Sequence, residues 1–218
     1  MLIANPIYDS VFKYLLEDNR VAKLIISTII DEDIEELELR PQERTSMLKP
    51  YSILIYRIDF AAIIRTADGE HKNVLIEIQK AKFATDLMRF RKYLGEQYLE
   101  SELINGKKTA LPIITIYFLG FKLEKILAPA IKINRSYIDA ITGETIDEKD
   151  EFVECLTHNS YVIQIPRLKP SRQNRLETML SVFDQHQIQG RNHFVLEVQD
   201  NLPGEYAMIT ERLSRAAM

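Results

Sequence analysis

The sequence is poor in the residues that mark several special classes of protein. It has one cysteine, Cys155, together with four histidines, seven glycines and eight prolines in 218 residues. A single cysteine excludes an intramolecular disulfide framework, and the scattered histidines provide no Cys/His zinc cluster of the usual spacing. So little glycine and proline excludes collagen-like and low-complexity chains. We therefore expect any metal bound by this chain to be held mainly by oxygen atoms.

The chain also lacks long apolar runs and a large excess of charge of one sign. Its longest apolar run, residues 111–121, is too short to span a bilayer, and no positive region precedes an apolar stretch at the N-terminus. We expect a cytoplasmic protein with no membrane partner. The 28 Lys and Arg residues nearly balance the 32 Asp and Glu residues, giving a formal charge of −4. This balance argues against coating of nucleic acid by bulk charge but allows a local basic face.

The pattern of apolar residues predicts one α/β domain. We expect a nuclease-like unit over residues 1–170, and a C-terminal helix and tail over 171–218 packed on the same domain. Residues 31–50 read as a polar connection, and those from 190 onward as a weakly determined tail. Helical periodicity covers 5–30, as one broken helix or two, 85–104 and 171–189. Strand patterns cover 51–65, 72–79, 111–121 and 161–165, with a second hairpin from 131 through a turn at 142–144.

The first predicted hairpin brings four polar residues together. If its turn is centred on Asp68, then Asp59 lies opposite Glu77, and Arg57 lies opposite Gln79, all on one face of the sheet. Two carboxylates on neighbouring strands repel each other unless they are protonated or bridged by a cation such as Mg²⁺. The pattern indicates a candidate metal site. A solvent-exposed face, in which Arg57 pairs with a carboxylate across the strands, is the alternative.

The motif around Glu77 resembles a known family. Asp59, followed by Ile76-Glu77-Ile78-Gln79, is similar to the Asp…Glu-x-Gln signature of the recombination-promoting nuclease and transposase-like family. That family belongs to the PD-(D/E)XK nuclease superfamily, in which most members have Lys at the position of Gln79. Four further segments resemble the family's motifs in the right order within residues 5–169: the Asn-x-x-x-Asp-x-x-Phe-Lys block at 5–13, Arg89 with Tyr93, the strand at 111–116, and the ending at 163–168.

The resemblance implies a restriction-endonuclease-like fold and a DNA endonuclease activity. The expected fold is a four-stranded mixed sheet flanked by helices, with an additional C-terminal hairpin and helix. Carried over by position, Asp59 and Glu77 would bind Mg²⁺ or Mn²⁺, and the Ile78 carbonyl would complete the ligand set. Gln79 would replace the lysine that orients water, although an amide is neither a general base nor a cation. Arg57, Arg89 or Lys92 remain candidates for the missing charge.

Cations follow the predicted metal ligands along the chain. We expect them to hold the DNA backbone with low sequence specificity, the alternative being a solvated helix face. They are Lys80, Lys82, Arg89, Arg91 and Lys92. Lys80 points to the opposite face from Glu77 if the strand is regular. The resemblance implies Asp9 as a further metal ligand, whereas its position at the start of the predicted helix favours the alternative of a helix N-cap.

Several alternatives stay open at this stage. The substrate could be RNA instead of DNA, because no feature of the sequence distinguishes the two. A homodimer is compatible with the sequence, which locates no interface. A catalytically degenerate nuclease fold that binds DNA or a protein is the alternative to an enzyme, because Gln79 stands where most members of the superfamily have Lys.

Overall fold

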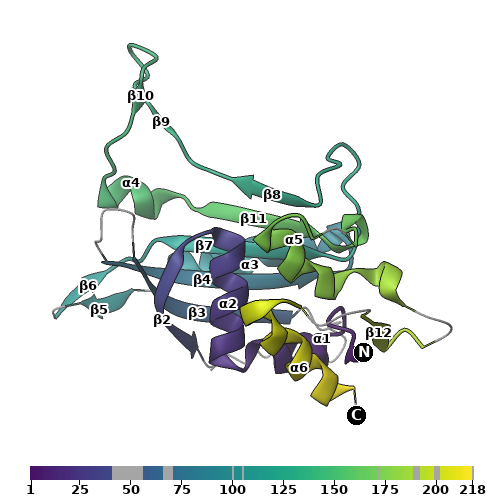
Figure 1. The fold of residues 1–218 in the computed structure, drawn as a ribbon. Coiled ribbons are helices and arrows are strands. Elements are labelled where there is room, and N and C mark those ends of the chain that lie inside the picture. Colours follow the sequence, from purple (N-terminus) through teal and green to yellow (C-terminus); the bar gives the residue numbers. More distant parts are fainter. Residues whose placement is uncertain are drawn as a thin grey trace.

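A six-stranded mixed β-sheet with helices on both faces forms the centre of the molecule (Figure 1). The computed structural model describes residues 1–40, 56–65, 71–99, 101–104, 106–170, 172–188, 192–198 and 202–217, without the side chains of 56–59, 77, 102–104 and 107. In spatial order the strands are β2 (Asp33–Arg40), β3 (Tyr56–Arg65), β4 (His71–Ala81), β7 (Ile113–Leu119), β11 (Asn159–Gln164) and β8 (Ala130–Ile133). The predicted α/β class with a mixed sheet flanked by helices is confirmed.

The sheet combines antiparallel and parallel pairs of strands. The first three strands form an antiparallel meander, β4, β7 and β11 run parallel to one another, and β8 returns antiparallel on β11. Antiparallel neighbours such as β3 and β4 need only a short connection, whereas the parallel step from β4 to β7 needs a crossover. That crossover contains the helix α3 (Leu87–Tyr98), preceded by a single 3-10 turn at Ala84–Asp86.

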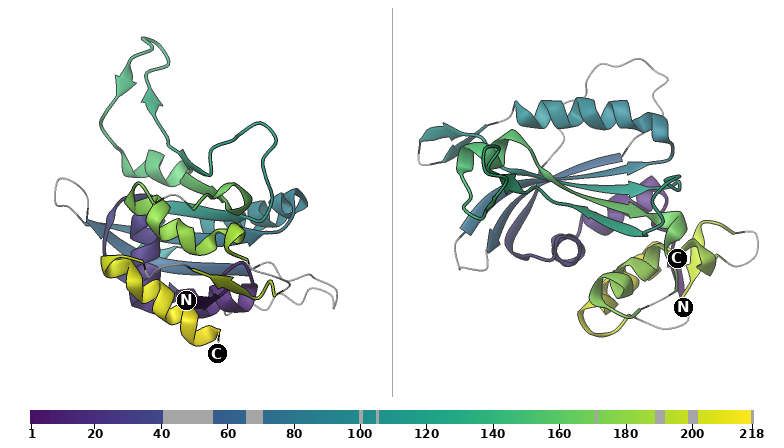
Figure 2. Two further views of the ribbon diagram at one scale, coloured as in Figure 1. Left: turned by 45° about the vertical axis from the view of Figure 1, so that its right-hand side comes forward. Right: turned by 90° about the horizontal axis from the view of Figure 1, so that it is seen from above.

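Two helices cover one face of the sheet and α3 covers the other, as the right panel of Figure 2 shows. The first pair is α1 (Asp9–Leu16) and α2 (Asn19–Ile30), so the N-terminal region forms two short helices. Asp18 caps α2 by accepting from the backbone N–H groups of Arg20 and Val21. Even-numbered residues of β4, including Ile76 and Ile78, join the core beneath α1 and α2. We call this side the α1/α2 face and the opposite side the α3 face.

Helix α3 is shorter than the periodicity predicted. It ends at Tyr98, and the last three residues of the predicted helix instead form β5 (Glu102–Ile104), which pairs with β6 (Lys107–Thr109). Gly106 in the connecting turn has a φ of +77°, which glycine adopts without strain. Asn-Gly in a sequence is a hairpin signal as well as a helix stop, and Gly106 lies between the two paired strands. Leu87, expected in the buried stripe, is exposed, and the buried face of α3 carries Phe90 and Gln97.

Strand β2 corrects the prediction that residues 31–50 form only a connection. It pairs antiparallel with β3 along the edge of the sheet, and a bulge between Ile34 and Glu36 shifts its register. The bulge brings Ile34 and Leu37, three residues apart, into the same core. Strict alternation is therefore lost, which explains why the sequence pattern did not reveal a strand. Residues 41–55 lie outside the described part of the chain.

The C-terminal third contains more structure than predicted. The hairpin β9 (Tyr137–Ile138) and β10 (Thr145–Ile146) turns at Gly143, as expected, but β8 pairs with β11 instead of continuing that hairpin. After α4 (Glu151–Leu156) and β11, the predicted helix over 171–189 is reduced to α5 (Arg175–Leu180) and two 3-10 turns.

The tail expected from residue 190 onward is also structured. Strand β12 (Val195–Glu197) pairs with β1 (Leu2–Ala4), and the chain ends in α6 (Ala207–Ala216). Leu196, Ile209 and Leu213 belong to the same core cluster as Phe12. None of the helices in the described part of the chain is both long enough and apolar enough to cross a membrane.

Candidate metal and nucleic-acid site

The predicted register of the first hairpin is confirmed. Asp59 is the Cα partner of Glu77, and Arg57 is the partner of Gln79. Glu77 lies between Leu75 and Gln79 on β4, and Leu75 packs with Leu94 of α3. The side chains of Arg57, Asp59 and Glu77 lie outside the part that the structure describes, and so do residues 66–70, for which a turn was predicted. What the structure establishes is that the two acidic positions are direct neighbours in the centre of the sheet.

A row of polar residues extends from these two positions across five strands. Its members are register partners in succession: Arg40 on β2, Asp59 on β3, Glu77 on β4, Thr115 on β7 and Ser160 on β11. Thr115 and Ser160 are buried, and the Thr115 hydroxyl donates to the Ser160 Oγ at 2.8 Å. In the row next to it, Ala61, Leu75 and Ile113 are apolar, and Glu38 follows on the edge strand β2. Polar residues at successive register positions on the inner strands mark position 77 as chemically distinct.

Thr115 and Ser160 were not predicted as site residues. Thr115 interrupts the apolar run over 111–121, and this was the one signal available in the sequence. Its meaning depends on strand order, because Thr115 meets Glu77 only when β7 pairs in parallel with β4. A pocket of about 280 Å³ reaches Arg40 and Ala61, which are the neighbours of Asp59 across and along the sheet.

Gln79 lies beneath the start of α3. Gln79 is fully buried. Its register partner on β7 is Tyr117, whose ring centre is 5.1 Å from that of Phe90 on α3. Ala81, two residues further along β4, belongs to the same apolar cluster as Phe90. The amide that replaces the lysine of the resembled motif therefore occupies a buried position, where a charged lysine would pay a desolvation cost.

Lys80 lies on the opposite face of the sheet, as expected for a regular strand. Its side chain is only 4% exposed, and Nζ lies 2.6 Å from the Asp9 Oδ1 and 5.6 Å from the centre of the Phe12 ring. The amine also donates to the Ile7 carbonyl. Burial lowers the pKa of Lys80, and the Asp9 carboxylate opposes this effect. Lys80 therefore links the start of α1 to β4 through its ion pair with Asp9. It does not lie on the surface with the other cations that were predicted to bind phosphate.

Asp9, the tentative metal ligand, is held by the same contact. It lies on the α1/α2 face with Lys80, whereas Leu75 and Ala81, which bracket positions 77 and 79, pack against α3 residues. The structure does not bring Asp9 to the Asp59–Glu77 pair. Asp9 is not a helix cap either, because the N-cap position is Tyr8 and no side chain caps α1. The ion pair borders a pocket of about 290 Å³ at the carboxyl ends of β4 and β7.

The remaining predicted cations lie on or beside α3. Lys82, Arg91 and Lys92 are exposed, and Arg89 is half-buried, one turn before the half-buried Tyr93. Exposed apolar side chains accompany these cations. We use the term α3 outer face for the exposed residues Lys82, Phe83, Leu87, Met88, Arg91, Lys92 and Leu99. The predicted basic face is thus a mixed surface of cations and large apolar groups.

The arrangement is chemically suited to a hard divalent cation. Two carboxylate residues at directly opposed strand positions provide oxygen donors of the kind that Mg²⁺ and Mn²⁺ prefer. Among the side chains that the structure describes, no three His, Cys, Asp or Glu groups gather into a metal site; Asp59 and Glu77 are not among them. Comparisons of the chain with models of protein families, with curated proteins and with solved structures found no match.

Proposed function

We propose that this chain is a metal-dependent DNA endonuclease with a restriction-endonuclease-like fold. The observation that carries the proposal is the register pairing of Asp59 with Glu77, in a row of polar residues that continues to the buried Thr115 and Ser160. The order of elements supports it: an antiparallel meander, a helix on one face and a strand that returns parallel to β4. Exposed cations on the helix that follows Glu77 provide a surface for DNA phosphates.

Each group has a distinct part in this proposal. Asp59, Glu77 and the Ile78 carbonyl would hold Mg²⁺. When bound, the cation would polarise a phosphodiester oxygen and lower the pKa of an attacking water. Gln79 would orient that water through its amide, since it cannot take the proton. Lys82, Arg91 and Lys92 would neutralise backbone phosphates, so binding is expected to be weakly sequence-specific and strongly salt-dependent.

The test is a plasmid-nicking assay with purified protein and Mg²⁺. Asp59→Asn and Glu77→Gln are each expected to reduce the nicking rate by at least about 100-fold, because each removes one charged ligand. Glu38→Gln, an exposed carboxylate on β2, is the matched control and is expected to retain activity. Thermal melts of all three variants establish that the fold persists. Nicking that survives in folded Asp59→Asn and Glu77→Gln proteins would refute the proposal.

The second candidate function is DNA or protein binding by a nuclease fold without catalysis. The position of Lys80 favours it: the amine is buried with Asp9 on the α1/α2 face, and the neutral Gln79 occupies the position of the usual lysine. Titration calorimetry with Mg²⁺ separates the candidates. The enzyme is expected to bind the ion in the wild type and lose it in Glu77→Gln, whereas the binding module is expected to bind DNA without the ion.

A further inference from the structure

A hairpin projects from the body of the molecule with apolar side chains on its surface. We call residues 137–150 the arm; it contains β9 and β10 and stands away from the sheet in Figures 1 and 2. Ile138, Ile141 and Ile146 are 60%, 96% and 39% exposed. Large aliphatic groups gathered on a projecting hairpin mark an interaction surface more strongly than single exposed residues do.

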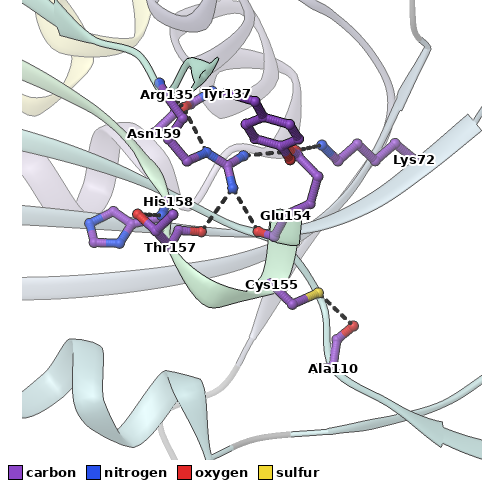
Figure 3. A network of polar contacts seen from close by, with 9 residues as sticks. All are labelled: Lys72, Ala110, Arg135, Tyr137, Glu154, Cys155, Thr157, His158 and Asn159. Carbon is purple, nitrogen blue, oxygen red and sulfur yellow. Dashed lines mark hydrogen bonds and ion pairs between the residues drawn. The ribbon is translucent and has the colours of Figure 1, made fainter. Parts of the chain in front are cut away.

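The base of the arm is fixed by a network of polar contacts (Figure 3). Tyr137, the first residue of β9, donates its hydroxyl to the Glu154 Oε1 at 2.6 Å, and Arg135 contacts the Glu154 Oε2 at 2.7 Å. The Arg135 side chain also donates to the Asn159 Oδ1 and to the Glu154 and Thr157 carbonyls. These contacts tie the arm to α4 and β11. Because its direction is set in advance, the arm would lose little conformational entropy on docking.

The charge of the arm restricts what it can contact. It carries five acidic residues, Asp139, Glu144, Asp147, Glu148 and Asp150, and one basic residue, Lys149. The Lys149 ammonium lies 4.1 Å from the centre of the Tyr137 ring, within the arm. Nucleic acid and anionic lipid would be repelled by this excess of carboxylates, and so would the arm of another copy. The arm fits a surface that is both apolar and basic.

The α3 outer face has this complementary chemistry. It combines Lys82, Arg91 and Lys92 with exposed Phe83, Leu87, Met88 and Leu99. We propose that the arm of one copy of this chain docks on the α3 outer face of a second copy. The contact is reciprocal, because each copy presents one arm and one α3 outer face, so two contacts can close a twofold dimer. The isoleucines would pack on the apolar residues of α3, and the carboxylates would face its cations.

The test of the dimer is independent of the proposed nuclease function, because sedimentation is measured without DNA. Sedimentation of the full chain at 0.05 M NaCl is expected to show a monomer–dimer equilibrium below 100 µM, weakening at least 10-fold at 0.5 M NaCl as charges are screened. The double variant Ile138→Ser and Ile141→Ser is expected to weaken it at least 10-fold. Leu127→Ser, an equally exposed leucine outside the arm, is the matched control.

Charge reversal tests the pairing of the two surfaces. One protein carries Arg91→Glu and Lys92→Glu, and the other carries Glu144→Lys, Asp147→Lys and Glu148→Lys, which change the formal charge of the arm from −4 to +2. Each alone is expected to be a monomer, because its arm and α3 face then have the same sign of charge. A mixture is expected to form heterodimers, because both contacts regain opposite charges. A wild-type chain that stays monomeric at 100 µM in low salt, a dimer unaffected by the arm variant, or reversed proteins that do not associate would each overturn the proposal.

Discussion

The Glu154 network provides a quantitative test of how the arm is anchored. Glu154 is 9% exposed, and its carboxylate lies 2.9 Å from the Lys72 Nζ and 2.7 Å from Arg135 (Figure 3). The substitution Glu154→Gln keeps the shape of the side chain and removes its charge. Lys72 and Arg135 then lose their anionic partner, although Arg135 keeps its contacts with Asn159 and with two carbonyls.

The pKa of Glu154 sets the size of the effect. Burial would raise the pKa of this carboxyl, but hydrogen bonds from Lys72 and Tyr137, with the charges of Lys72 and Arg135, lower it from 4.5 to about 2. A difference of this size between folded and unfolded states corresponds to about 3 kcal/mol of stability at neutral pH. The Lys72 side chain is 38% exposed, so solvent screens its charge, and we expect about half that value in the variant.

The sign of the pH dependence follows from the lowered pKa. As pH falls, the unfolded state takes up the proton near 4.5, before the folded state does near 2. The stabilisation is therefore complete above 4.5 and is lost progressively below it. At pH 3.5 we expect about half of the difference between wild type and Glu154→Gln to have disappeared.

Urea unfolding at pH 7 and pH 3.5 measures both quantities. Glu151→Gln, an exposed carboxylate on the same helix, is the control and is expected to change the free energy of unfolding by less than about 0.5 kcal/mol. A Glu154→Gln difference that is the same at both pH values, or no larger than that of the control at pH 7, would show that the network does not stabilise the fold.

Three further substitutions test other contacts. Phe12→Ala removes a buried ring 5.1 Å from that of Phe118 and is expected to cost about 3–5 kcal/mol in urea unfolding; a cost below about 1 kcal/mol would contradict this packing. Asn5→Ala removes a buried amide that donates to Gln185 and to the His193 carbonyl, so amide exchange in β12 is expected to accelerate, and unchanged exchange would refute the link. Asp9→Asn is expected to lower the pKa of Lys80 further, since burial then acts unopposed; nitrogen NMR titration of the lysine amines measures it, and an unchanged pKa would argue against the pair.

Sequence patterns predicted the parts of the fold that depend on local alternation. The pairing of Asp59 with Glu77 followed from two alternating strands and one turn, and it is correct. Strand β2 was missed because its bulge places Ile34 and Leu37 on one side at a spacing of three. Strand β12 was missed because it spans three residues and pairs with β1 at the other end of the chain. No local pattern encodes such a partner.

The candidate site shows the same division between local and long-range information. Alternation correctly put Lys80 opposite Gln79, but only the packing of α1 on the sheet shows that its amine binds Asp9. The block at 5–13, which resembles the family's opening motif, likewise has structural roles in this chain. Asn5 donates hydrogen bonds to Gln185 and to the His193 carbonyl, and Phe12 is part of the core. Thr115 and Ser160 join Asp59 and Glu77 only through strand order.

The near balance of charge in the composition conceals a spatial separation. Acidic residues concentrate on the arm, and cations accompany apolar groups on the α3 outer face, at a different place on the same chain. DNA and the arm of a second copy, both negatively charged, would therefore compete for the α3 outer face. The two contacts differ in their chemistry, because DNA has no aliphatic groups to match Leu87 and Met88, whereas the arm has three isoleucines. Raised salt should weaken both contacts, but the apolar part of the dimer contact would persist, so the ratio of dimer to DNA complex should rise with ionic strength.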